Sequence, residues 1–301
     1  AGFLNNRINF TFDIYTRRNY DLIGATNTMG IGGEPTKYGN VAKMKSNGVE
    51  LSLNTVNIKT KDFTWTTDFI YSHMHNEVTE LNTYNRLYDY ISGYGFTMPG
   101  YPQRSLFSIP FAGLNNEGLP TFYDPDGNIT VTGIDMQEYD PERLKFLKYE
   151  GPADPTDVGS LGNIFRYKNL TLNLFITYSF GNVVRLDPVF SSEYSDLSAT
   201  PKEFNNRWIK PGDEKFTNIP VIASRQQLNN LAYLSRAYQS YNYSTARVAK
   251  GDFIRMKEIS LAYEFPKTIT QPLHLSTLAL KLQARNLFLL YKDKKMNGQD
   301  P

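Results

Sequence analysis

Apolar and polar residues alternate with a period of two in six separated windows of the chain. Each window is about 9–13 residues long, whereas strands of soluble proteins usually have about five or six. Successive side chains of a strand point to opposite faces, so each window predicts a β-strand with one apolar and one polar face. The apolar positions are Ile8, Phe10, Phe12 and Ile14; Val49, Leu51 and Leu53; Phe63, Trp65, Phe69 and Tyr71; Leu170, Leu172, Leu174, Ile176, Tyr178 and Phe180; Ile259, Leu261, Tyr263 and Phe265; and Leu278, Leu280, Leu282 and Ala284.

The polar faces of these windows carry Asn, Thr, Lys, Arg and Glu, so we expect them to face water rather than a second sheet. Strand length and the aromatic residues at strand ends, such as Tyr178 and Phe180, favour membrane-spanning strands bordered by aromatic girdles. A soluble, half-buried sheet gives the same alternation and also carries aromatic residues at its edges. The pattern therefore favours a membrane barrel and leaves a soluble sheet open.

The connections between the windows differ in length. Lys59–Asp62 and Pro266–Ser276 are short. The long connections, rich in Gly, Pro, Asn and Tyr, are Thr16–Asn47, Ser72–Lys168 and Gly181–Tyr241. Short turns on one side and long loops on the other are typical of bacterial outer-membrane barrels. If both short links lie on one side, residues 72–253 must contain further crossings, for which Arg104–Ala112 and Tyr243–Val248 are the candidates.

Composition removes several classes of protein. The 32 basic and 30 acidic residues give a net charge of +2 without a basic block, so we expect no nucleic-acid partner. There is no cysteine and there are only 3 histidines, which excludes disulfides and thiolate chemistry. A mean hydropathy of −0.45 and a longest apolar run of Leu287–Tyr291 predict no membrane-spanning helix. Ala1 is not a start methionine and no signal peptide follows, so we expect a piece of a longer protein.

Local motifs add no catalytic or metal site. Tyr123–Asn128 has alternating acidic residues like a calcium loop, but Pro-Asp-Gly also forms turns on backbone grounds alone, and the turn is favoured. His73 and His75 share one strand face without a third ligand nearby, which favours a polar strand end. No nucleophile elbow, metalloprotease or phosphate-loop motif occurs. We therefore expect no enzyme, no catalytic residue, no metal and no cofactor.

Two loop segments concentrate aromatic and polar side chains. They are Tyr94–Pro102 and Phe204–Pro220. Exposed aromatic residues beside charged groups suit stacking on sugar rings or contact with a protein partner. Packing of the long loops upon themselves is the equally weighted alternative. For a partner surface the candidates are Phe204, Arg207 and Trp208; ligand-binding residues remain unknown.

Five segments resemble one known family in the same order along the chain. NGVELSLNTVNIKTKDFTWTTDFIYSHMHNEV (Asn47–Val78), RYKNLTLNLFITYSFGNVVRL (Arg166–Leu186) and NNRWIKPGDEKFTNIP (Asn205–Pro220) resemble a hairpin, a late strand and an external loop of SusC/RagA-type TonB-dependent outer-membrane transporters. STARVAKGDFIRMKEISLAYEFP (Ser244–Pro266) and LQARNLFLLYKDKKMNGQDP (Leu282–Pro301) are similar to the family's closing segments. The matches span nearly the whole chain.

The resemblance implies an all-β fold: an antiparallel transmembrane β-barrel segment with long extracellular loops, part of a barrel of about 22 strands. It implies that residues 1–301 form the C-terminal portion of that barrel, without the plug domain and the final strand. The outward faces meeting lipid would then include Ile8, Phe10 and Phe12; Leu170, Leu172 and Leu174; and Leu278, Leu280 and Leu282.

The resemblance also implies a function. Members of this family import oligosaccharides or oligopeptides across the bacterial outer membrane with a SusD-like surface lipoprotein, driven by TonB acting through the plug and N-terminal segment. The expected partners of this chain are therefore a SusD-like lipoprotein, TonB, an oligosaccharide or peptide ligand, and outer-membrane lipid. The alternative is a soluble or surface-attached β-sandwich that binds glycans, which the residue pattern alone also permits.

Overall fold

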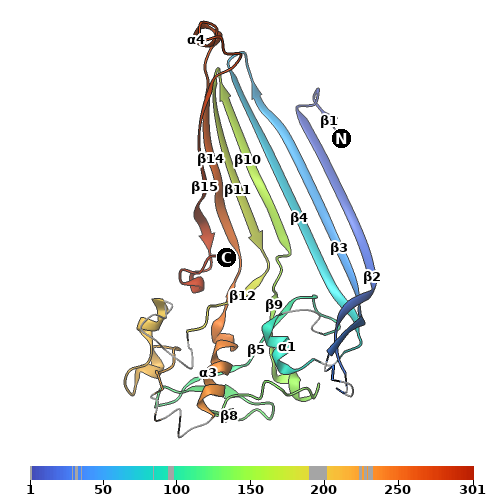
Figure 1. The fold of residues 1–301 in the computed structure, drawn as a ribbon, viewed down its shortest axis with the longest axis vertical. Helices are drawn as coiled ribbons and strands as arrows, with labels where there is room; N and C mark the ends of the chain where they lie inside the picture. The colour runs from blue at the N-terminus through green and yellow to red at the C-terminus, as the bar shows by residue number, and fades with distance from the viewer. Residues whose placement is uncertain are drawn as a thin grey trace.

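The protein consists of a tall antiparallel sheet with a layer of loops gathered at one of its ends (Figure 1). The computed structural model describes residues 2–28, 30, 33–34, 36–83, 85–93, 98–189, 202–223, 226, 229 and 233–301. No helix in these ranges is both long and apolar enough to cross a membrane.

The sheet has eight strands in the order β1-β2-β3-β4-β10-β11-β14-β15, and every neighbouring pair is antiparallel. Its strands are β1 (Gly2–Phe3), β2 (Ile8–Asn27), β3 (Thr36–Lys59), β4 (Phe63–Leu81), β10 (Asp157–Tyr167), β11 (Leu170–Phe180), β14 (Phe253–Glu264) and β15 (Ala279–Lys292). The predicted antiparallel all-β fold is confirmed. A β-sandwich requires a second sheet packed on the first. Within the described residues no second large sheet pairs with the eight-stranded one, so the sandwich alternative is not favoured.

The two faces of the sheet differ in polarity because the strands are paired in phase. One row across the strands reads Phe12, Leu51, Tyr71, Gly159 and Tyr178, and we call its face the outer face. The next row reads Asp13, Glu50, Ser72, Val158 and Ser179, on the face that we call the inner face. A shift of one residue in any strand would exchange its two faces, so the apolar pattern determines the register.

The outer face leaves large apolar side chains open. Phe12 is 51% exposed, Ile14 71% and Leu282 65%. A contiguous apolar surface of this size is unfavourable in water and favourable against lipid or another apolar surface. Trp65 stacks on Phe165 towards one end of this face, and Tyr178 packs against Phe180 towards the other, as interfacial aromatic residues of membrane strands do.

The tight connections all lie at one end of the sheet, at the top in Figure 1, and the long loops lie at the other. The tight end holds the turn at 60–62, the turn at 168–169 and the link 265–278 with α4 (Lys267–Thr270). The predicted asymmetry of the connections is therefore confirmed.

The predicted positions of the extra crossings were wrong. The additional strand is β10, which the sequence pattern missed because Gly159 and Asn163 occupy outer-face positions and interrupt its apolar alternation. Arg104–Ala112 instead enters the loops, where Phe107 and Ile109 are apolar because they are buried in a loop core. Tyr243–Val248 forms a short 3-10 turn at the same end of the molecule.

The predicted loop Thr16–Asn47 was also wrong in extent. Residues 17–27 and 36–46 continue β2 and β3 as a paired hairpin, with Arg17 opposite Ser46 and Asn27 opposite Thr36. Polar side chains dominate both strands here, so the hydrophobic alternation stops although the backbone ladder continues.

The loops form the second part of the molecule, which we call the loop layer (residues 82–156 and 181–252 as far as described). Its elements are α1 (Leu87–Ser92), β5 (Ser105–Ser108), β6 (Phe111–Leu114), β7 (Pro120–Tyr123), β8 (Ile129–Thr130), η1 (Arg143–Phe146), β9 (Lys148–Pro152), β12 (Val183–Arg185), η2 (Lys202–Asn206), η3 (Asp213–Lys215), α3 (Leu234–Asn242), η4 (Thr245–Arg247) and β13 (Val248–Lys250). Short sheets β5-β9, β6-β7-β8 and β12-β13 brace it, and η5 (Lys294–Met296) follows β15. Its largest apolar cluster includes Leu87, Phe107, Ile109, Phe122 and Tyr241.

Candidate functional site

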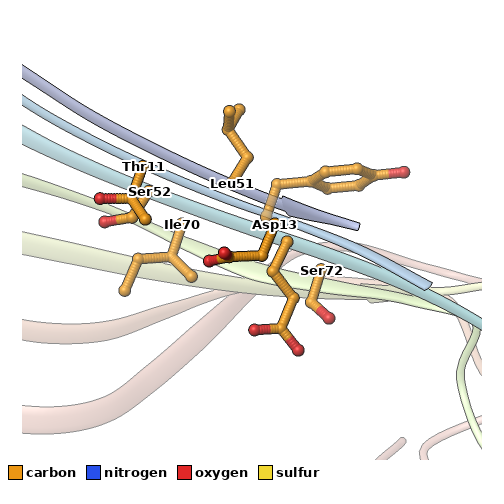
Figure 2. A pocket seen from close by; sticks show the side chains of 8 residues that line it. Thr11, Asp13, Leu51, Ser52, Ile70 and Ser72 are labelled. Carbon is orange, nitrogen blue, oxygen red and sulfur yellow. The ribbon is translucent and has the colours of Figure 1, made fainter. Parts of the chain in front are cut away.

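A shallow pocket lies on the inner face where β2, β3 and β4 run side by side. It has a volume of about 320 Å³. Thr11, Asp13, Ser52, Ile70 and Ser72 project to one side of the sheet, whereas Leu51 leaves from the other (Figure 2). The pocket is therefore lined by the polar rows of three strands.

Asp13 and Glu50 stand directly opposite each other across β2 and β3 in this pocket. Like charges in directly opposite positions destabilise a sheet by several tenths of a kcal/mol, roughly 0.2–1. Four rows away, the Asn54 amide donates to the Asp68 carboxylate. This part of the inner face thus presents acceptors, which suit the O–H and N–H groups of a polar ligand.

The inner face is more basic at β14 and β15. Arg285 lies opposite Glu258 and pairs with it, with Nε to Oε2 at 3.4 Å. Arg255 pairs with Asp300, and Lys281 lies four rows along β15 from Arg285. The inner wall therefore carries carboxylates at β2 and β3, and mostly ion-paired charges of both signs at β14 and β15.

Arg185 on β12 joins several segments of the loop layer. Its Nη1 donates to Ser108 Oγ at 2.9 Å and to the Ser244 carbonyl at 3.2 Å. Its Nη2 donates to the carbonyls of Ile91 at 3.0 Å and Phe107 at 2.7 Å. Burial lowers the pKa of Arg185 to about 10, so the guanidinium stays protonated at neutral pH. A single cation therefore fixes α1, β5 and the turn after α3 to the base of the loops.

The segment that follows β15 attaches to the same strand. Gln299 Nε2 donates to the Arg185 carbonyl at 3.2 Å, and the Asp187 backbone N–H donates to Gln299 Oε1 at 2.9 Å. Met296 is 2% exposed and packs with Leu186. The amide side chain of Gln299 thus pairs with β12 much as a neighbouring strand would.

The three residues predicted to contact a partner lie in one loop but differ in orientation. The Arg207 guanidinium lies 5.0 Å from the centre of the Phe204 ring. Trp208 is 8% exposed, its indole packs against Gly118, and its Nε1 donates to Glu214 Oε2 at 3.1 Å. The structure brings Phe204 and Arg207 together and turns Trp208 inward. Their contact with a partner stays a prediction.

Two exposed apolar residues beside them did not stand out in the sequence. Ile209 is 67% exposed and Phe216 is 89% exposed. Asp213 accepts the backbone N–H groups of Ile209 and Lys210, which closes the turn between them. Backbone hydrogen bonds and the indole N–H hold the pKa of Glu214 below its ordinary value. The signal in the sequence was an isolated apolar residue on each side of a Pro-Gly turn.

The other aromatic segment packs into the loop layer where it is described. Residues 94–97 of Tyr94–Pro102 lie outside the described residues. The Tyr101 ring lies 5.3 Å from that of Phe107 and 4.8 Å from that of Tyr149. This part of the segment follows the self-packing alternative.

The motifs considered for metal binding have other partners. His73 Nδ1 lies 2.8 Å from Asp157 Oδ1, which also accepts the Tyr71 hydroxyl at 2.6 Å. Asp124 accepts the backbone N–H groups of Asp126 at 3.0 Å and Asn128 at 2.8 Å, as an Asx turn does. Within the described ranges, no three His, Asp or Glu side chains gather as a metal site would require.

No family model matches the chain. It is 26% identical to TonB-dependent receptor P3 of Formosa agariphila, covering 100% of this chain and 29% of that protein. It is 27% identical to the TonB-dependent receptor SusC of Bacteroides thetaiotaomicron, covering 88% of this chain and 25% of that protein. The chain thus spans less than a third of the length of these relatives, whose names denote receptors and not enzymes.

Solved structures agree on the fold. The RagAB peptide transporter superposes with a TM-score of 0.70 at 24% identity, covering 97% of this chain and 31% of that one. At this identity the likeness establishes the fold alone, a wall of a transmembrane β-barrel. In sequence the chain is therefore similar to part of a TonB-dependent receptor of the SusC type, and in fold to a wall of the outer-membrane barrel of the RagAB transporter.

Proposed function

We propose that the whole receptor actively imports oligosaccharides or oligopeptides across the outer membrane, driven by TonB and assisted by a SusD-like surface lipoprotein. The observation that carries this proposal is the division of the sheet into an apolar outer face and a polar inner face, in a chain similar to TonB-dependent receptors along its whole length. The outer face suits lipid, and the inner face suits a passage for polar solutes.

Residues 1–301 are proposed to be the C-terminal portion of a barrel of about 22 strands, with the plug domain and final strand outside this segment. Among the described residues, β15 pairs only with β14, and β2 has on its other side the two-residue β1. In lipid, such open edges leave backbone groups without hydrogen bonds, and ring closure with further strands satisfies them. TonB is proposed to act through the plug and the N-terminal segment.

The loop layer is proposed to face the cell exterior and to receive the lipoprotein. Support comes from the loop Phe204–Pro220, where Ile209 and Phe216 expose apolar side chains beside the stacked pair Arg207 and Phe204. Buried Trp208 would hold the shape of this loop, while its exposed neighbours supply the contact area. Apolar side chains ringed by charged groups are typical of protein interfaces.

The proposal is tested by deleting the receptor gene in its native host and measuring uptake of labelled oligosaccharides and oligopeptides. We expect loss of uptake of one ligand class, restored by the full-length gene and abolished by a protonophore. Uptake unchanged by the deletion, or a receptor that dissolves without detergent, contradicts the proposal and returns the soluble β-sandwich alternative.

The partner surface has its own test. Affinity purification of the full-length receptor is expected to recover a surface lipoprotein, and Phe216→Asp is expected to reduce that recovery at least about tenfold by placing a charge in an apolar contact. Ile222→Asp, an equally apolar but less exposed position at 39%, serves as the control. Equal recovery from Phe216→Asp and the unaltered receptor contradicts this surface.

A further inference from the structure

A second pocket, of about 230 Å³, opens within the loop layer. Its wall is assembled from the start of α1, the β7–β8 hairpin, the segments at 132–135 and 138–143, and α3. None of the residues predicted from the sequence to contact a partner takes part in it. We call it the loop pocket.

The loop pocket is held open by hydrogen bonds between its own walls. The backbone N–H of Leu87 donates to the Glu138 carbonyl at 2.7 Å, which ties α1 to the segment opposite. The backbone N–H of Ile134 donates to Ser240 Oγ at 3.0 Å, which ties the next segment to α3. Gly133, at a φ of +73°, lies so close to the α3 backbone that a Cβ there would collide with it. Such a preformed pocket loses little freedom when it binds.

Two of the three carboxylates of the pocket are held through one oxygen. Asp124 Oδ1 accepts two backbone N–H groups of its own turn, and Asp135 Oδ1 accepts the backbone N–H of Gln137 at 3.0 Å. Among the described residues, Oδ2 of both aspartates has no hydrogen bond. Glu138 is paired with Arg143, with Oε2 to Nε at 2.9 Å. The pocket therefore presents two fixed acceptor oxygens.

Donors lie on the same lining. Arg236 lines the pocket and is exposed, and it forms no ion pair or side-chain hydrogen bond with any described residue. The hydroxyls of Thr130 and Thr132 are 2.8 Å apart, and Thr132 Oγ1 also donates to the Gly133 carbonyl at 3.5 Å. Leu87, 0% exposed, and Ile134, 5% exposed, form an apolar floor beneath these polar groups.

We propose that the loop pocket binds one sugar residue of a neutral oligosaccharide, as a capture site for the import function proposed above. Each sugar hydroxyl both donates and accepts, which matches a guanidinium and two carboxylate oxygens that line one pocket with apolar side chains able to receive the C–H face of the ring. Three carboxylates against two guanidinium groups disfavour an anionic ligand. An extended peptide is bound by a free strand edge with a row of side-chain pockets, not by one compact pocket.

The test uses the full-length receptor purified in detergent. It is incubated with a mixture of neutral oligosaccharides from starch, xylan and agarose hydrolysates and, separately, with a tryptic digest of casein. Captured ligand is identified by native mass spectrometry, and its affinity is measured by calorimetry. We expect capture of an oligosaccharide, and at least about tenfold weaker binding in Arg236→Ala, the effect of about one lost charged hydrogen bond.

Arg104→Ala is the matched control, because Arg104 is also an exposed loop arginine but pairs with Asp154 outside the loop pocket. Unfolding of both variants is followed by melting curves. Unchanged oligosaccharide affinity in Arg236→Ala, capture of peptide only, or no capture from either mixture overturns the loop pocket as a sugar site. If the sugar site fails this test but gene deletion still abolishes ligand uptake, the import function is retained. Failure of the sugar site can therefore be distinguished from failure of the import function.

Discussion

The sheet and the loop layer place their apolar side chains in opposite ways. In the sheet, Phe12, Ile14 and Leu282 are more than half exposed on the outer face. In the loop layer, Leu87, Ile109 and Phe122 are fully buried. The loop layer is built as a water-soluble domain is, around its own core, whereas the sheet depends on the solvent that covers its outer face. The two parts are therefore expected to respond to different substitutions.

The largest effect is expected at Arg185. Arg185→Ala removes the guanidinium that serves four acceptors in three loop segments and leaves them buried. We expect the loop layer to lose about 4 kcal/mol of stability. Limited proteolysis of the full-length receptor measures it: cleavage within 82–156 should rise, while the barrel keeps its heat-modifiable migration on gels.

Arg185→Lys tests the geometry separately from the charge. An ammonium cannot reproduce the planar fork of a guanidinium, so this variant should be intermediate. Protease resistance equal to that of the unaltered receptor in both variants would mean that Arg185 does not hold the loop layer together.

A charge on the outer face is the next largest effect. Leu161 and Ser160 are neighbours on β10 but point to opposite faces, with Leu161 beside Phe69 and Ser160 beside Thr177. Leu161→Arg should destabilise the barrel by about 2–4 kcal/mol in lipid, because it places a cation against hydrocarbon. Ser160→Arg, on the water-facing side, should have little effect. Urea unfolding in lipid vesicles measures both, and equal destabilisation would contradict the assignment of the faces.

The sheet could be predicted from the sequence more completely than the loop layer. The windows around Phe12, Leu51 and Leu172 predict their strands and faces because lipid on one side and water on the other enforce strict alternation. β10 escaped prediction because Gly159 lies beneath the Tyr178 ring and Asn163 hydrogen-bonds the Trp65 indole. Contacts with other strands determine which residues fit at these positions, and the pattern within one strand does not show those contacts.

In the loop layer the same logic fails more widely. The loop pocket joins Leu87, Thr132 and Arg236, which lie far apart in the chain and carry no shared motif. Trp208 was a reasonable candidate for an exposed anchor, yet Gly118, a distant residue, leaves the space that buries it. Residue type predicts that an aromatic side chain contacts something, whereas only tertiary structure decides which surface that is.

A smaller effect is expected from substitutions at two glycines of β10, which differ in the space around them. At Gly159 a Cβ would collide with the Ile70 carbonyl oxygen and the Tyr178 phenol, whereas at Gly162 it would meet neighbours at ordinary distances of 3.5–3.8 Å. Gly159→Ala should therefore destabilise the barrel by about 2 kcal/mol, and Gly162→Ala by much less. Tyr178 Oη also donates across β10 to the Ile70 carbonyl at 3.0 Å. Urea unfolding in vesicles compares the two, and an equal loss would argue against this crossing.

The smallest effect concerns the contact between the two parts. Gln299, beyond the end of β15, donates to the Arg185 carbonyl and accepts the Asp187 N–H, so it links the sheet to the base of the loop layer. Gln299→Ala should cost about 1 kcal/mol locally, which corresponds to about fivefold faster hydrogen exchange in peptides that cover 183–189. Gln299→Glu keeps the acceptor and loses the donor, so its exchange rate should fall between those of the unaltered receptor and Gln299→Ala. Exchange in a β10 peptide should stay unchanged, because the barrel ladder does not depend on this link; acceleration there as well would mean that the loop layer and the sheet unfold as one unit.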